Sequence, residues 1–214
     1  MSQELRGAFH RELDKLDLAL ATLLGLVPDA VGQATTALLA GDADLSETVA
    51  RWRGLVSELY SDVDGTIEGV MARQSPVARD LRFLMCCVRV VPEVRDAMEL
   101  IGWLGIPRRD ALSDRLTPRM RRLTLSLSDV TAETWGAVDR LWRERQADAL
   151  VAVRQRHDAQ AEVHSSLMAE VAAGGIDVDG AIHMALIISG YERLAGHAMA
   201  IGRLVTPLVV PAPA

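Results

Sequence analysis

Aromatic residues are scarce in this chain of 214 residues, and the chain has no excess of basic over acidic charge. Aromatics make up 4% of the sequence, and 8 Pro with 16 Gly leave room for few turns, so a strand-rich fold is disfavoured. The formal net charge of -6 argues against a nucleic-acid partner, because phosphate contacts require a dense basic face. We therefore expect an all-α protein that binds no nucleic acid.

Cysteines and long apolar runs are also scarce. The only cysteines, Cys86 and Cys87, project about 100° apart from a helix, so they are poorly placed to pair and we expect reduced, packed thiols. No unbroken apolar run approaches the roughly 20 residues that span a bilayer. The first residues, Met-Ser-Gln-Glu-Leu-Arg, lack the apolar core of a signal peptide. These absences predict a cytoplasmic protein without a transmembrane segment.

Apolar residues recur in steps of three and four along six stretches, which is the spacing of amphipathic helices. The first stretch runs from Phe9 to Leu38 and contains Pro28, which we expect to kink or divide the helix. The third stretch opens at Pro76, and its predicted buried stripe is Leu81, Leu84, Val88, Val91, Val94, Met98 and Ile101. The stripe predicted for the fifth stretch is Leu150, Val153, His157, Ala161, His164, Met168 and Val171.

Short motifs mark where helices begin and end. Ser75-Pro76 and Thr117-Pro118 each place a hydroxyl side chain before a proline at the first helical position. We expect Asp177 or Asp179 to cap the last helix. The residues from Pro207 onwards are apolar and interrupted by proline, and we expect them to be frayed or docked rather than helical.

The second half of the chain repeats the pattern of the first half. We therefore predict two tandem three-helix bundles that form an internal repeat, at residues 1–107 and 108–206, followed by a C-terminal tail at 207–214. The arginine-rich stretch from Arg108 to Arg122 is a predicted linker, with contact to anionic headgroups or to an acidic protein as the alternative. Trp103, Trp135 and Trp142 add apolar area that favours a homodimer.

One stretch carries a specific resemblance. Met71-Ala72-Arg73-Gln74-Ser75-Pro76-Val77-Ala78-Arg79-Asp80-Leu81-Arg82 resembles the helix-2 to helix-3 junction of the PhoU family, in which an Ala-Arg-Gln-Gln-Pro-Val-Ala-x-Asp-Leu-Arg run is the most recognisable feature. From Phe9 to about Val205 the rest of the resemblance is mostly apolar pattern. Independently of the repeat, it implies two tandem three-helix bundles.

The resemblance also implies a function. PhoU-like proteins are cytoplasmic negative regulators of phosphate uptake and phosphate-starvation signalling. They contact the ATPase subunit of the phosphate ABC transporter and a sensor histidine kinase, and the partners bring them to the membrane periphery. No nucleophile elbow, phosphate-cradling glycine loop or zinc spacing is present in the sequence, so we expect no enzyme. A diverged paralogue with other partners is the alternative.

The family's acidic pairs point to a metal site. PhoU-like proteins carry Glu/Asp-x-x-x-Asp pairs on the second and third helix of each bundle, where two acids share a helix face and ligate a cation. In the second bundle Asp158, Glu162 and Glu192 match, while Gly196 replaces the fourth acid. In the first bundle the matching residues are Arg53, Ser57, Arg95 and Glu99. We therefore expect no metal at the first bundle, and at the second either weak binding of iron or zinc or none.

Histidines leave two interpretations open at the second bundle. His157 and His164 lie beside the acids, and His197 follows Gly196, so a rebuilt His/carboxylate metal site is one interpretation and a metal-binding protein the corresponding alternative function. The other interpretation is hydrogen-bonded histidines next to a solvated acidic face. In the first bundle, Arg53 and Arg95 form either a patch for an acidic partner or phosphate, or a salt-bridged face with Arg95 paired to Glu99.

Arginines surround the family-like junction. Arg73, Arg79 and Arg82 lie close to a helix N-terminus, where positive charge opposes the helix dipole. Capping therefore does not explain them. We expect these three arginines to bind carboxylates of the neighbouring bundle or of a partner protein.

Overall fold

The computed structural model describes residues 2–40, 46–73, 78–105 and 112–209. These residues form helices and short connecting turns, with no strand among them, so the all-α prediction is confirmed. The helices are α1 (Ser2–Ala40), α2 (Ser46–Arg73), α3 (Ala78–Leu104), α4 (Leu112–Arg115), α5 (Pro118–Glu144), α6 (Ala147–Ala172) and α7 (Val178–Val209). Ser75-Pro76 lies outside the described residues.

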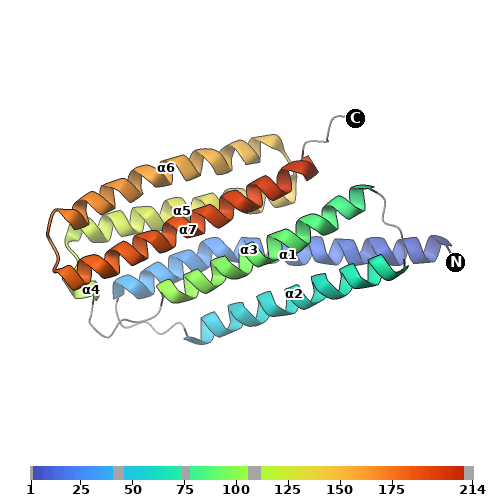
Figure 1. Cartoon of the computed structure of the whole chain (residues 1–214), viewed down its shortest axis with the longest axis horizontal. Helices are drawn as coiled ribbons and strands as arrows, with labels where there is room; N and C mark the ends of the chain where they lie inside the picture. The colour runs from blue at the N-terminus through green and yellow to red at the C-terminus, as the bar shows by residue number, and fades with distance from the viewer. Residues whose placement is uncertain (1, 41–45, 74–77, 106–111, 210–214) are drawn as a thin grey trace.

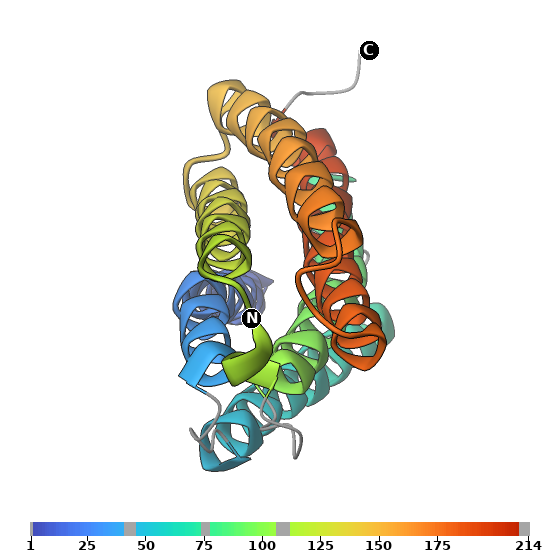
Figure 2. The same cartoon turned by 90° about the vertical axis from the view of Figure 1, so that its left-hand side faces the viewer.

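The helices form two triplets that share one hydrophobic core. Figure 1 shows α5, α6 and α7 as one layer beside α1, α2 and α3. Helix α1 packs on α5 and α3 packs on α7, and Figure 2 shows this arrangement along the length of the molecule. The buried apolar residues of both triplets form one continuous cluster. The two triplets therefore have an extensive common interface. The division into domains at residue 107 stays a prediction.

Helix α1 is the central helix of the first triplet. The apolar residues that recur in steps of three and four along this helix are all buried, as predicted: Phe9, Leu13, Leu16, Leu20, Leu23, Val27, Val31, Ala34 and Leu38. Pro28 lies inside a helix that runs unbroken from Ser2 to Ala40, so it does not divide the helix. The segment Phe9–Ala40 is long and apolar enough to cross a membrane by length and composition, contrary to our expectation. Its outward positions include neutral residues such as Thr22, Gly25 and Thr36, which lower the mean hydropathy much less than charged residues do. Half of the apolar window is buried in the bundle, as in the core helix of a globular protein.

Two predicted stripes differ from the observed ones. On α3, Leu84, Val91, Val94, Met98 and Ile101 are buried, but Leu81 and Val88 are 39% and 38% exposed, so the prediction is wrong for these two. Cys87 and Val90 take the intervening core positions. On α6, Ala161 and Met168 are exposed, and Gln160 and Leu167 are buried instead. In part of each helix, the buried residue is therefore the one that directly precedes the predicted residue.

Caps and arginine contacts fix the second triplet. Thr117 is the N-cap of α5, with its hydroxyl accepting from the Met120 N–H at 3.1 Å, as predicted. Asp177 caps α7, because its carboxylate accepts from the Gly180 N–H at 2.9 Å. Arg115 also binds Asp177, and together these two contacts hold the pKa of that carboxyl below its usual range. The basic stretch is therefore engaged in part with the α6–α7 turn.

The last helix runs further than predicted. Helix α7 continues through Pro207 to Val209, so the expectation that 207–214 is not helical is wrong for its first three residues. Leu208 and Val209 pack on the core, which compensates for the backbone hydrogen bond that proline cannot donate. Residues 210–214 lie outside the described residues.

Candidate functional site

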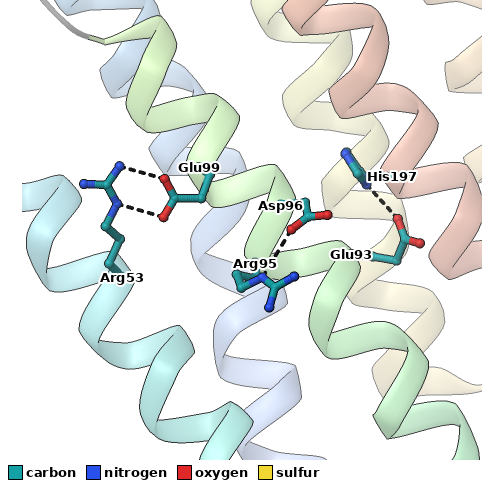
Figure 3. A network of polar contacts seen from close by, with 6 residues as sticks. All are labelled: Arg53, Glu93, Arg95, Asp96, Glu99 and His197. Atoms are coloured by element: carbon teal, nitrogen blue, oxygen red, sulfur yellow. Dashed lines mark hydrogen bonds and ion pairs between the residues drawn. The ribbon is translucent and has the colours of Figure 1, made fainter.

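The first-bundle positions that match the family's acidic pairs form an ion pair. Arg53 of α2 donates to Glu99 of α3 through both sides of its guanidinium, with Nε to Oε1 at 2.8 Å and the Nη2 atom to Oε2 at 2.6 Å. Figure 3 shows this bidentate pair bridging the two helices. The Glu99 side chain raises the pKa of Arg53, chiefly through the hydrogen bond. A guanidinium occupies the place where a cation would lie, so these residues do not fit a metal site.

The salt bridge within α3 differs from the predicted one. We expected Arg95 to pair with Glu99 one turn later, but Arg95 donates to Asp96 at 3.2 Å and lies 5.9 Å from the ring centroid of Tyr60. Glu99 is already bound by Arg53 from the neighbouring helix. The interpretation as a salt-bridged face is therefore confirmed, but the predicted pair of Arg95 with Glu99 is wrong.

The second-bundle candidates lie on α6 and α7. Asp158, Glu162 and Glu192 are exposed, and His157 is partly buried with its Nδ1 atom lacking a hydrogen-bond partner in the described structure. His164 Nε2 lies 3.8 Å from Glu192 Oε2, which joins the two helices. No group of three or more His, Cys, Asp or Glu side chains is arranged to hold a metal within the ranges that the structure describes. Iron and zinc sites use three or more protein ligands, so this pair alone does not fit one.

His197 belongs to a different contact. Its Nδ1 atom lies 2.6 Å from Glu93 Oε2, and both side chains are mostly buried between α7 and α3 (Figure 3). This pair therefore connects the two helix triplets rather than contributing to the acidic face of α6. Glu93 and His197 are far apart in the sequence, and the packing of α3 on α7 brings them together.

The three junction arginines lie at the α2–α3 connection. Arg73 ends α2, and its side chain lies outside the described residues. Arg79 and Arg82 are exposed on the first turns of α3, and neither forms a hydrogen bond or an ion pair with another described residue. Nothing among the described residues of the neighbouring bundle binds them. Binding of these arginines to carboxylates of a partner protein stays a prediction.

Sequence reasoning missed the polar contacts at the interface of the triplets. Trp142 Nε1 donates to the Asp17 carbonyl at 3.2 Å, and the Arg145 guanidinium lies 3.9 Å from the centroid of the Trp142 ring. Arg145 also donates to Asp17 Oδ1 at 2.7 Å and has a positive φ of 53° at the end of α5. A non-glycine residue held in this conformation indicates strong local constraint. The only sign of these contacts in the sequence is the interruption of the apolar pattern near Glu144, between the stretches that form α5 and α6.

The thiols behave as predicted for packed cysteines. Cys86 and Cys87 are free and buried. Burial raises the pKa of Cys86 to about 11 and raises the pKa of Cys87 further. Because the thiolate is the reactive form, these cysteines are poor nucleophiles in the folded protein.

Comparisons with known proteins agree on one family. No family model matches the chain. The chain is 25% identical over 205 residues to the phosphate-specific transport system accessory protein PhoU homolog 2 of Mycobacterium tuberculosis, covering 94% of this chain and 96% of that protein. It is 27% identical over 210 residues to PhoU homolog 1 of Mycobacterium leprae, covering 94% and 92%.

Solved structures agree in fold. The crystal structure of PhoU from Pseudomonas aeruginosa superposes with a TM-score of 0.79 at 22% identity, covering 94% of this chain and 98% of the other. The phosphate transport system regulatory protein PhoU from Streptococcus pneumoniae gives a TM-score of 0.77 at 16% identity, covering 94% and 96%. Similarity in sequence and in fold thus extends over nearly the whole chain.

Proposed function

Sequence and fold together support the chain as a member of the PhoU family, and from that premise we propose that it is an accessory regulator of phosphate transport. The observation that carries the proposal is similarity over 94% of the chain to proteins named for that accessory role. Coverage of both triplets matters, because a match to one triplet alone would support only a shared helical module.

The mechanism we propose is binding without turnover. The chain contacts the ATPase subunit of the phosphate transporter and a sensor histidine kinase on the cytoplasmic side, and it holds off the starvation response when phosphate is plentiful. Exposed helical surfaces supply the contacts. We also propose that the protein is a homodimer, which light scattering on the purified protein tests directly.

Deletion of the gene in its own host tests this function. A reporter driven by a phosphate-starvation promoter is measured in high and low phosphate. We expect expression in high phosphate to rise towards the starvation level, and a copy of the wild-type gene to restore repression. Retained repression in the deletion strain would contradict the proposal and leave a diverged paralogue with other partners as the explanation.

Co-purification tests the partners. The tagged protein is captured from cells grown in high and low phosphate, and the transporter ATPase and the kinase are detected with specific antibodies. We expect both in the high-phosphate eluate. Loss of high-phosphate repression on deletion, without either protein in the eluate, would retain the regulatory role and reject these partners.

A further inference from the structure

The first half of α3 has an exposed face that mixes basic and apolar side chains. We define the α3 basic face as Leu81, Arg82, Met85, Val88 and Arg89. Its apolar members are exposed, with Leu81 at 39%, Met85 at 45% and Val88 at 38% of their surface open to solvent. Figure 1 shows this part of α3 at the end of the molecule where the chain termini lie.

The face is organised in two rows along the helix. At about 100° per residue, Leu81, Met85 and Val88 fall within an arc of about 60°. Arg82 and Arg89 follow on one side, within about 60° of Met85. The side opposite the basic row is buried, through Leu84, Cys87 and Val91. An apolar row therefore runs beside a basic row, over roughly 12 Å of helix.

The charge on this face is not neutralised within the described structure. Arg82 and Arg89 form no hydrogen bond or ion pair with a described residue. Other arginines of the chain, such as Arg53 and Arg143, are held by carboxylates. The one acidic residue within 79–89 is Asp80, which is half-buried. A positive face is thus kept on a chain whose net charge is -6.

We propose that the α3 basic face binds an acidic amphipathic helix of a partner protein. A partner helix of two to three turns can place apolar side chains on Leu81, Met85 and Val88, and its carboxylates then lie over Arg82 and Arg89. The inference rests on the proposed function in that the partner belongs to the phosphate transport or signalling machinery.

Two other occupants fit the face less well. A second copy packed antiparallel about a two-fold axis sets the Arg82 and Arg89 row against itself, which is repulsive. An anionic membrane attracts the two arginines of the face by only about 1 kcal/mol each, and it repels the negative charge of the remaining chain. An acidic helix avoids both penalties.

Site-specific crosslinking tests the proposal. Met85 is replaced by the photo-reactive residue p-benzoylphenylalanine in the native host, and the crosslinked segment is identified by peptide mass spectrometry. We expect one protein segment with apolar residues at helical spacing, flanked by Asp or Glu. Arg82→Glu with Arg89→Glu should reduce the crosslink at least tenfold. Reversing the acids of the partner segment to Arg should restore it.

Controls separate a docking role from loss of fold. Arg154→Glu with Arg193→Glu reverses two exposed arginines on α6 and α7 and should leave the crosslink unchanged. Circular dichroism and the melting temperature report whether each variant folds. If the variant with Arg82→Glu and Arg89→Glu does not fold, a second variant, Met85→Gln, replaces it. The captured partner segment is made as a peptide, and its affinity for the wild type and for Met85→Gln is measured. We expect at least a tenfold loss of affinity.

Several outcomes overturn the proposal. These are a crosslink unaffected by charge reversal, no protein crosslink, a crosslink to a second copy, or arginine-dependent sedimentation with vesicles that contain phosphatidylglycerol. The reporter distinguishes this failure from failure of the proposed function. If deletion derepresses the reporter while Arg82→Glu with Arg89→Glu does not, the regulatory role stands and the surface is wrong. If deletion has no effect, the proposed function fails.

Discussion

The Tyr191 hydroxyl of α7 lies 2.6 Å from the Thr35 hydroxyl of α1, in the shared core of the two helix triplets. Ser128 of α5 completes the contact, with its hydroxyl oxygen 2.8 Å from that of Thr35. All three side chains are buried, and burial raises the pKa of Tyr191 to about 12. A satisfied polar contact of this kind fixes which turn of α1 faces α7, because a shifted register leaves buried hydroxyls without partners.

The first prediction concerns alkaline stability. The folded state keeps Tyr191 neutral up to about pH 12, whereas in the unfolded chain it ionises near pH 10. The free energy of unfolding should therefore fall as pH rises from about 10 through 12. Tyr191→Phe should cost about 1 kcal/mol at neutral pH and reduce this alkaline loss. Urea unfolding of both proteins at pH 8 and pH 11 measures the difference, and equal losses would contradict it.

The second prediction concerns metal at the second bundle, where Asp158, Glu162, Glu192 and His157 stay the predicted ligands. We expect iron or zinc to bind weakly, with a Kd above roughly 1 μM, because His164 and Glu192 supply only one close pair. Isothermal titration with zinc measures this affinity. A tightly bound stoichiometric metal after native purification would contradict the prediction and favour the metalloprotein alternative.

Gly196 offers a matched variant for the same titration. A Cβ atom at Gly196 meets no atom within 4 Å, so Gly196→Asp adds the missing carboxylate without a steric clash at Cβ. We expect this variant to bind zinc more tightly than the wild type. Glu162→Gln in the Gly196→Asp background should remove the gain, and an unchanged affinity in both would indicate that Gly196 does not face the acids.

The third prediction concerns the Arg53 and Glu99 pair. Both side chains are about half exposed, so a double-mutant cycle with Ala should give a coupling of about 0.3–1 kcal/mol despite the bidentate geometry. The coupling should shrink in 1 M NaCl, because salt screens exposed charges. Lys15 with Glu12 is the matched exposed control and should couple less. Coupling above about 2 kcal/mol would show that the pair is shielded from solvent.

Every position that helix periodicity predicted as buried on α1 is buried, whereas on α3 the prediction holds only in part. After Leu84, steps of both three and four residues are compatible with the helical repeat, and the sequence favours Val88 over Cys87. The observed core continues through Cys87, which is fully buried, while Cys86 beside it donates to the Leu204 carbonyl of α7. On α6 the prediction missed the buried Gln160. A polar residue is not expected in the core unless its hydrogen-bond partner is known, and the sequence does not show that partner. That partner is the Tyr191 carbonyl, at 2.8 Å.

At the candidate sites too, the sequence predicts which residues are neighbours within one helix but not which residues meet between two helices. Sequence spacing places Arg95 and Glu99 on neighbouring turns, and it therefore predicted their pairing. It carries no information on the rotation of α2 about its axis, which is what presents Arg53 to Glu99. The pairing of His197 with Glu93 likewise depends on the packing of α7 against α3.

The last prediction separates strain from contact at Arg145. Its φ of 53° disfavours any residue with a Cβ, while its guanidinium stacks on Trp142 and binds Asp17. Arg145→Ala loses the contacts and keeps the strain, so we expect the larger destabilisation. Arg145→Gly loses the same contacts but relieves the strain, and it should be about 1 kcal/mol more stable than the Ala variant. Urea unfolding of the three proteins measures this order. If the Gly and Ala variants are equally stable, the backbone at Arg145 relaxes once the guanidinium is removed, and its contacts rather than the helix end hold the left-handed conformation.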